Sequence, residues 1–316
     1  MQIGCFVEKY NFHTKDETLA LERFKSTAEA MGHGFEFIFK KDLNRLQEFD
    51  AIFIRANTDP MNTAYVVSRM ADAMGKVVID DPHSIRICSS KVVLDGLFRQ
   101  NDIPSPKSLL FDGNYRPESI RSVFDYLGFP VVVKAPYTKF SSHVEKAHDE
   151  AELREITARY LKNATPIVLQ EFMPTSFDWR VGMLDNKILY LCKYLMPKGG
   201  WKVKSIVNGK HVWGDTVPIF RKNIPRKLED LAVKVSKCVG DGLYGLDIKE
   251  VDGGYYCIEI NDNPSFYGGL EDAKDRDIYE KIIERLTSGR PVKPGTYRVE
   301  PAAAAFEAGR GRAAGY

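Results

Sequence analysis

Short apolar runs alternate with amphipathic stretches along the first quarter of the chain. Runs of strand length lie at residues 3–7, 35–39, 51–54 and 77–79, and helical periodicity covers 17–31 and 62–74. Gly32 and Gly75 follow the two helical stretches, as glycine often follows the C-terminus of a helix. Strands that alternate with helices predict a doubly wound parallel sheet. The pattern breaks near Asp80-Asp81-Pro82, and we place this N-terminal α/β domain at residues 1–88.

The rest of the chain mixes strands and helices less regularly, and we divide it into units at 89–170 and 171–290. In the first unit we expect strands at 108–111, 131–134 and 167–170 and helices at 90–99, 117–127 and 149–161. In the second unit we expect strands at 179–184, 188–195, 246–249 and 255–260 and helices at 225–238 and 277–286. Residues 291–316 are poor in large apolar side chains and are predicted to form a flexible tail.

Composition excludes several classes of protein. Hydrophobic residues make up 44% of the 316 residues and charged residues 28%, which is ordinary for a globular chain and excludes wholesale disorder. No apolar run approaches the roughly 20 residues that span a bilayer, and the start carries no secretory signal pattern. The 5 cysteines are scattered along the chain. We expect them to be reduced, mostly buried thiols of a cytoplasmic protein, with no disulfide frame or zinc site.

The formal charge of +2 conceals a strong segregation of charge along the chain. No acidic residue lies between residues 186 and 214, a stretch with six lysines: Lys187, Lys193, Lys198, Lys202, Lys204 and Lys210. Acidic residues dominate between 241 and 280. A basic block beside an acidic block suits a site that holds both a phosphate group and a cation.

Three oxygen-bearing side chains are predicted to converge in the acidic block. Glu259 and Asn261 are two residues apart on an extended segment, so they point to the same face. The turn signal at 252–254 folds Asp247 back beside them. Two carboxylates and an amide oxygen are hard ligands suited to Mg²⁺, with Mn²⁺ as the second candidate. The alternative is a solvated polar face, in which the isoleucines on either side of Glu259 form the only buried face.

Magnesium implies phosphate, and three further positions suit a nucleotide. Lys134 ends the strand at 131–134, and Lys91 begins a helix after two serines. The stretch Gln170-Glu171-Phe172-Met173 closes another strand and combines backbone donors, a carboxylate and apolar walls, as an adenine requires. Taken alone, each of these positions is equally well explained as an ordinary end of an element.

The order and spacing of these motifs resemble the ATP-grasp ligases, above all the RimK-like amino-acid ligases. The resemblance covers residues 2–286 and rests on these motifs: Lys91, Val-Val-Lys134, Gln-Glu171-Phe-Met, Asp178-Trp-Arg180, Lys198-Gly-Gly-Trp-Lys202, Gly-Leu-Asp247 and Glu259-Ile-Asn261. It implies an ATP-grasp fold, with 89–170 as the central subdomain, 171–290 as the C-terminal subdomain and residues 1–88 as a preceding domain.

The resemblance also implies roles for individual residues. Phosphates would be contacted by Lys91, Lys134, Ser141 and Ser142, and the rest of the nucleotide by Gln170, Glu171, Phe172, Met173, Asp178 and Lys193. Asp247, Glu259 and Asn261 would hold Mg²⁺, while Arg180 and Lys202 would act at the γ-phosphate or at the acyl phosphate formed from it. The implied reaction joins a small carboxylate, such as the amino acid glutamate, to an amine on an amino acid, a peptide or a protein. A homo-oligomer is left open.

Two departures from the family and two alternatives accompany this interpretation. Lys202 stands where relatives more often have arginine, so the charge is kept and the bidentate fork is lost. Relatives carry a glycine-rich phosphate loop, whereas residues 138–144 hold no glycine, and the polar stretch 137–146 is the expected lid over the site. This departure favours the alternative of a nucleotide-binding regulatory module that has lost turnover. The lysine block, with its aromatic residues Tyr190, Tyr194, Trp201 and Trp213, could instead form a nucleic-acid surface. The near-neutral net charge argues against that reading.

Overall fold

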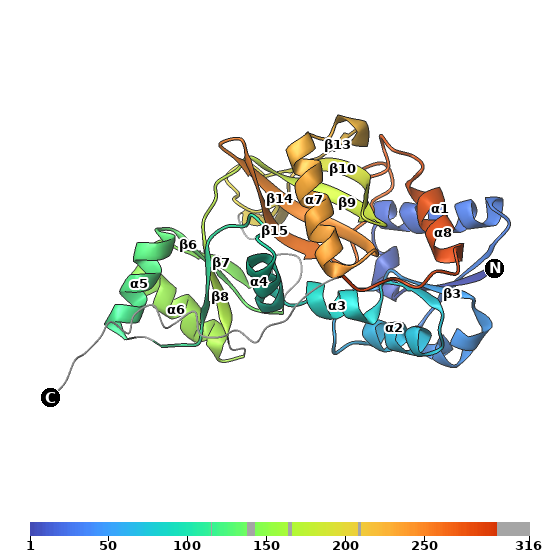
Figure 1. Cartoon of the computed structure of the whole chain (residues 1–316), viewed down its shortest axis with the longest axis horizontal. Coiled ribbons are helices and arrows are strands. Elements are labelled where there is room, and N and C mark those ends of the chain that lie inside the picture. Colours follow the sequence, from blue (N-terminus) through green and yellow to red (C-terminus); the bar gives the residue numbers. More distant parts are fainter. Residues whose placement is uncertain (115, 138–142, 164–165, 208–209, 296–316) are drawn as a thin grey trace.

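Three packed units make up the protein in a computed structural model, which describes residues 1–295 except 115, 138–142, 164–165 and 208–209. A large antiparallel sheet lies in the middle, the N-terminal unit lies on one side of it, and a smaller sheet with two helices lies on the other (Figure 1). The predicted flexible tail, beyond its first five residues, falls outside the described residues, as do Ser141 and Ser142. No helix in the described ranges is long and apolar enough to cross a bilayer.

The N-terminal unit is the predicted parallel sheet. Its strands, in the order β2-β1-β3-β4, are β2 (Gly34–Ile38), β1 (Gln2–Phe6), β3 (Ala51–Ile54) and β4 (Val77–Ile79). Its helices are α1 (Lys15–Ala30), α2 (Thr63–Ala73) and α3 (Pro82–Cys88), with two 3₁₀ helices, η1 (Lys9–Phe12) and η2 (Lys40–Glu48). The Asp81 carboxylate accepts from the backbone N–H groups of His83 and Ser84 at 3.0 and 3.1 Å and so caps α3. The acids and proline that interrupt the apolar pattern therefore begin a helix.

The smaller sheet has the order β5-β8-β6-β7, with all neighbours antiparallel. Its elements are β5 (Ser108–Phe111), α5 (Pro117–Leu127), β6 (Val131–Lys134), β7 (Val144–Ala147), α6 (Glu150–Leu161) and β8 (Ile167–Glu171). Buried side chains such as Val131, Leu153 and Leu169 form its separate hydrophobic core. Helix α4 (Lys91–Gln100) precedes β5, but its apolar face packs into the core of the large sheet.

The large sheet has the order β13-β10-β9-β14-β15 and is also antiparallel. Its strands are β9 (Phe177–Leu184), β10 (Lys187–Leu195), β13 (Thr216–Ile219), β14 (Leu243–Val251) and β15 (Gly254–Asn261). The remaining elements are the β11 (Lys204–Val207) and β12 (Lys210–Trp213) pair, η3 (Arg221–Asn223), α7 (Arg226–Val239) and α8 (Ile278–Thr287). Asp252 and Gly253 have φ values of 50° and 72°, as the tight turn of the predicted β14–β15 hairpin requires.

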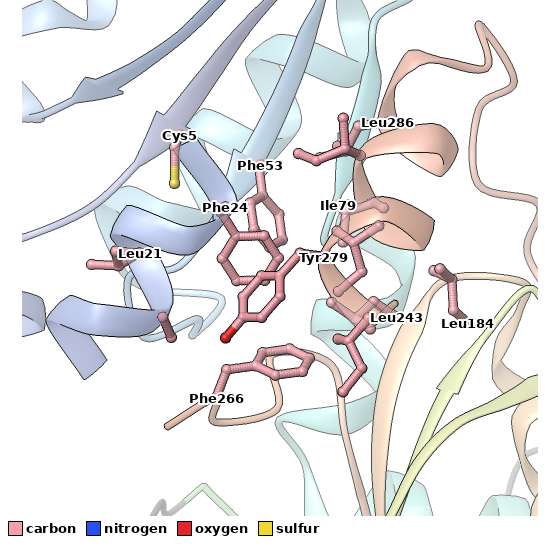
Figure 2. Packing of buried hydrophobic residues seen from close by; sticks show 14 of the residues in the cluster. Cys5, Leu21, Phe24, Phe53, Ile79, Leu184, Leu243, Phe266, Tyr279 and Leu286 are labelled. Carbon is pink, nitrogen blue, oxygen red and sulfur yellow. The ribbon is translucent and has the colours of Figure 1, made fainter. Parts of the chain in front are cut away.

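A hydrophobic cluster joins the N-terminal unit to the large sheet (Figure 2). The Phe24 ring of α1 lies 4.7 Å from the Tyr279 ring of α8, 4.9 Å from the Phe53 ring and 5.7 Å from the Phe266 ring. Phe266 belongs to the loop that follows β15, so this cluster fixes that loop against the N-terminal sheet. All five cysteines are buried and free, so their predicted burial is confirmed.

Candidate functional site

The predicted oxygen ligands converge on the β14–β15 hairpin. Asp247 pairs with Glu259 across the hairpin, and Asn261 pairs with Gly245 two positions further along. The Asn261 amide Nδ2 lies 3.3 Å from Asp247 Oδ2, so the three side chains share one face of the sheet. The prediction that they lie together is confirmed, and local alternation together with the turn is sufficient to explain it.

A β-bulge corrects one detail of that prediction. Ile248 pairs with Cys257 and Asp247 with Glu259, so Ile258 is the extra residue of the bulge. Ile258 lines the cleft beside Glu259, whereas Ile260 is fully buried on the other face. The two isoleucines therefore do not share a face, and the bulge places an apolar side chain in the cleft next to a carboxylate.

The chemistry of this donor set fits Mg²⁺. Burial raises the pKa of Asp247 to about 6, although the neighbouring Arg180 opposes the shift, so a bound cation would stabilise the ionised carboxylate. Within the described ranges, no group of three or more His, Cys, Asp or Glu side chains could hold a metal ion. A Mg²⁺ ion at the two carboxylates would need the Asn261 amide and water or phosphate oxygens to complete its coordination shell.

Cations face these carboxylates. Lys91 Nζ lies 2.9 Å from Glu259 Oε1, and Arg180 Nε lies 3.0 Å from Asp247 Oδ1. Both ion pairs are largely buried, so they are only weakly screened by solvent. Lys91 starts α4 and Arg180 lies on β9, so two elements outside the hairpin bring positive charge to its carboxylates.

Lys134 lies buried at the end of β6, in the same narrow cleft as Lys91, Gln170 and Glu259. Burial lowers the pKa of Lys134 to about 8; the nearby Glu259 opposes this, and the like charges of Lys91 and Lys249 add to it. An anion with several negative charges would relieve this cluster of cations. The cleft thus brings together four of the predicted positions, from α4, β6, β8 and β15.

The other predicted nucleotide contacts lie at the exit of β8. Glu171 is tied to the start of β5, since its Oε1 accepts from the Lys107 N–H at 2.6 Å. The Phe172 ring lies edge-on to the Trp201 ring at 5.8 Å, and Lys146 Nζ lies 4.4 Å from the Phe172 centroid. Met173 follows in the half-buried link to β9. These residues form the connection between the two sheets.

Lys202 is held against the smaller sheet. Its Nζ donates to the Val144 carbonyl of β7 at 2.7 Å, and burial lowers its pKa while Glu145 opposes the shift. The predicted lid at 137–146 ends on this strand, while 138–142 lie outside the described residues. The segment that follows β10 therefore crosses to β7 and bridges the two sheets beside the cleft.

Lys193 is placed away from the site. It pairs with Trp179 across β9 and β10, whereas Arg180 pairs with the neighbouring Cys192, so the two cations lie on opposite faces of the sheet. Lys193 Nζ contacts the Phe177 and Trp179 rings at 4.1 and 4.7 Å from their centroids. The prediction of a nucleotide contact at Lys193 is wrong, because strand register turned that side chain to the face covered by α7.

Lys249 is a residue that the sequence reasoning missed. Its Nζ lies 2.7 Å from Asp178 Oδ1 and 2.6 Å from Thr175 Oγ1, so it engages the residue expected to contact a ribose. Lys249 is two residues after Asp247 on the same strand. The same alternation that grouped Glu259 with Asn261 could have placed Lys249 beside Asp247.

Two of the four aromatic residues in the nucleic-acid alternative are buried, whereas Trp213 is 51% exposed. Tyr190 and Tyr194 are 0% and 9% exposed, so their rings cannot stack on bases. Both belong to the hydrophobic cluster under the large sheet, as the alternation of apolar residues predicts.

Comparisons with known proteins agree with this geometry. A model of the RimK-like ATP-grasp domain matches residues 88–286. The chain is 24% identical over 230 residues to coenzyme gamma-F420-2:alpha-L-glutamate ligase of Methanococcus maripaludis, which covers 70% of this chain and 75% of that protein. It is 24% identical over 238 residues to alpha-aminoadipate–LysW ligase LysX of Saccharolobus solfataricus, covering 72% and 80%.

Solved structures with the same fold include a ligase and a RimK domain ATP-grasp protein. D-alanine–D-alanine ligase of Bacillus anthracis superposes with a TM-score of 0.69 at 16% identity, covering 92% of this chain and 97% of that one. A RimK domain ATP-grasp protein of Sphaerobacter thermophilus gives 0.65 at 16% identity, covering 90% and 99%. The expected fold, an ATP-grasp unit after a parallel-sheet domain, is confirmed.

Proposed function

Since the chain belongs to the RimK-like ATP-grasp family, as the match over residues 88–286 establishes, we propose that it is an ADP-forming carboxylate–amine ligase. In the first step a carboxylate oxygen attacks the γ-phosphorus of ATP, the bond to the β-phosphate oxygen breaks, and an acyl phosphate and ADP result. In the second step an amine attacks the acyl carbon, inorganic phosphate leaves, and the amine gives up a proton to form an amide. The observation that carries the proposal is the meeting of the Asp247, Glu259 and Asn261 donors with Lys91, Lys134 and Arg180.

The donor is an amino acid such as glutamate, and the acceptor is the amine of an amino acid, a peptide or a protein. Relatives named as a glutamate ligase and an alpha-aminoadipate ligase support an amino-acid donor. The second relative is named for the ligation of alpha-aminoadipate to LysW, which supports an amine-bearing acceptor. Buried free thiols support a cytoplasmic location, where ATP is available.

Asp247, Glu259 and Asn261 would hold Mg²⁺, which neutralises the charge that spreads over the phosphate oxygens during transfer. Lys91 and Lys134 bind the phosphates from the opposite wall of the cleft, and Asp178 accepts from the ribose hydroxyls. Phosphoryl transfer needs little beyond such positioned charges.

Binding of nucleotide requires the internal ion pairs to rearrange. Lys91 and Arg180 neutralise Glu259 and Asp247 at 2.9 and 3.0 Å. Phosphates compete for the two cations while Mg²⁺ competes for the two carboxylates, so either ligand alone would leave buried charge unpaired. We therefore expect nucleotide and metal to bind with positive cooperativity.

The test is a hydroxylamine-trapping screen of amino acids with ATP and Mg²⁺, because hydroxylamine converts an acyl phosphate into a stable hydroxamate. Hydroxamate and ADP should form in equal amounts, and Glu259→Gln and Asn261→Ala should abolish both. Lys193→Met, on the other face of the same sheet, is the matched control and should react like the parent. Equal turnover by the Glu259 and Asn261 variants would refute the metal assignment.

The second candidate is a nucleotide-binding module without turnover, favoured by the absence of glycine at 138–144. Calorimetric binding of ATP without any ADP formation across the amino-acid panel would establish that candidate instead.

A further inference from the structure

The Arg180 guanidinium is held from two sides. Its Nε forms an ion pair with Asp247 Oδ1 at 3.0 Å without the alignment of a hydrogen bond, and its central carbon lies 4.9 Å from the centroid of the Tyr194 ring. A side chain at Gly245 would collide with it, because a Cβ there would lie 2.8 Å from Arg180 Nη1. Arg180 therefore fits between a carboxylate, an aromatic ring and a bare stretch of backbone.

The Tyr194 ring is itself held by a buried carboxylate. Its hydroxyl donates to Glu271 Oε1 at 2.5 Å, and Glu271 Oε2 accepts from the Tyr267 N–H at 2.8 Å. Glu271 is only 2% exposed, and burial raises its pKa against the opposing effect of these two bonds and of Arg180. Both oxygens of this carboxylate are thus used to fix neighbouring groups.

The loop that carries Glu271 is anchored at both ends to the N-terminal unit. Asp272 accepts from the Tyr279 hydroxyl at 2.9 Å and forms an ion pair with Arg23 of α1. Arg55, at the end of β3, donates from Nη2 to the Pro264 carbonyl at 2.8 Å. Glu271 is therefore presented from a rigid segment, as a positioning group must be.

The two anchors of Arg180 respond differently to a bound metal. Mg²⁺ at Asp247 takes over the charge of that carboxylate and weakens its attraction for Arg180. The contact with the Tyr194 ring does not involve a metal ligand, so it persists when the site is filled. Without it, the guanidinium would lose its principal support at the moment when phosphate is transferred.

We propose that Glu271 is a positioning residue, which acts through the Tyr194 ring to hold Arg180 in place once the metal has bound Asp247. This inference rests on the proposed function, since it assigns the γ-phosphate as the group that Arg180 contacts. It adds two residues, from β10 and from the loop after β15, that none of the predicted motifs includes.

The experiment is a double-mutant cycle between Glu271→Leu and Arg180→Lys. A displaced guanidinium lowers the rate of a positioned reaction by about 10- to 100-fold, so Glu271→Leu should lower kcat for hydroxamate formation by that factor with little change in KM for ATP. Adding Glu271→Leu to Arg180→Lys should cost little more than Arg180→Lys alone, because both changes disturb one interaction. Glu271→Gln keeps one oxygen acceptor for the tyrosine hydroxyl but sets an amide NH2 group against the Tyr267 N–H, so it should restore only part of the rate.

Two further variants separate positioning from general damage. Tyr194→Phe keeps the ring and removes only its link to Glu271, so it should show the same non-additivity with Arg180→Lys. This variant carries the test if Glu271→Leu does not fold. Asp272→Leu removes a neighbouring buried acid that anchors the same loop without contacting Tyr194. It should lower the melting temperature, and its effect on kcat should add to that of Arg180→Lys. Additive cycles for Glu271 and Tyr194 would overturn the proposal.

The same variants are also measured without substrate, by their affinity for Mg·ADP with aluminium fluoride. This complex is a mimic of the transferring phosphate. A parent protein that forms no hydroxamate but shows coupled losses of this affinity would refute the ligase function and retain the positioning role. A parent that ligates but gives additive cycles would refute the positioning role alone. Failure of the parent to bind the mimic would refute both the assignment of Arg180 and its positioning.

Discussion

Replacing Lys134 with methionine should stabilise the unliganded protein while removing its ability to bind nucleotide. Lys134 ends β6 with an exposure of only 8%, and burial is the main cause that lowers its pKa. A methionine has a similar length and no charge to desolvate, so it suits this position better than an ammonium does.

The magnitude follows from the pKa. A change of one in pKa corresponds to about 1.4 kcal/mol, so the fall from 10.5 to about 8 means that protonated Lys134 costs the folded state about 3 kcal/mol at pH 7. The unfolded chain binds more protons than the folded one between pH 8 and 10.5, so the stability of the parent rises with pH across this window. The gain in free energy of unfolding from Lys134→Met should therefore shrink to about 2 kcal/mol at pH 9.

Urea unfolding followed by circular dichroism at pH 7 and pH 9 measures both values. Lys91→Met is the matched control in the same cleft, because it leaves the Glu259 carboxylate without the cation that lies 2.9 Å away. That control should lose stability at both pH values. Calorimetry with Mg·ATP should give no detectable binding by Lys134→Met.

Two results would refute the reasoning. A Lys134→Met variant that is no more stable than the parent at pH 7 would mean that the ammonium is not held in the cleft at a cost. An advantage that stays constant between pH 7 and pH 9 would mean that the gain comes from apolar packing and not from removing a charge.

Four further predictions concern the large sheet. Mg²⁺ requires an ionised Asp247, whose pKa is raised to about 6, so the affinity for Mg²⁺ in titrations should fall about tenfold per pH unit below that value. Without metal, the raised pKa means that protonated Asp247 contributes to the stability of the fold at low pH, and that this contribution is lost as the pH rises through 6. Unfolding measured at pH 5 and pH 7 tests this. Lys249→Met removes the 2.7 Å partner of Asp178 and should raise KM for ATP by about five- to tenfold with kcat retained, whereas a kcat effect alone would contradict a role at the ribose. Gly245→Ala places a Cβ 2.7 Å from Pro264 Cβ and 2.8 Å from Arg180 Nη1 and should lower kcat by at least about tenfold; unchanged kinetics would show that both neighbours have room to move.

Local pattern accounts for much of this site. Asp247, Glu259 and Asn261 could be grouped from the sequence because a strand alternates its side chains with a period of two and a tight turn brings the second strand back beside the first. The same period could have found Lys249. These features depend on neighbours within about fifteen residues along the chain, so no knowledge of distant contacts is needed.

Lys193 shows where such reasoning stops. It lies on a correctly predicted strand and carries the charge that a phosphate needs, yet its register against β9 turns it to the face opposite Arg180. A shift of one residue moves a side chain to the other face of a sheet, and register is set by the packing of the whole sheet. The bulge at Ile258 has the same effect within β15.

The amino-acid sequence by itself determined the chemical inventory of this protein: the oxygen ligands on one hairpin, the lysines at the ends of elements, and the alternation that specifies each sheet. The tertiary structure alone decided which of the cations face the carboxylates and what holds them there. Glu271 meets Tyr194 from a position 77 residues away in the chain, because a loop docked on the N-terminal unit brings it under the large sheet. Side-chain type and period are local properties, whereas register, bulges and docking depend on packing between distant segments.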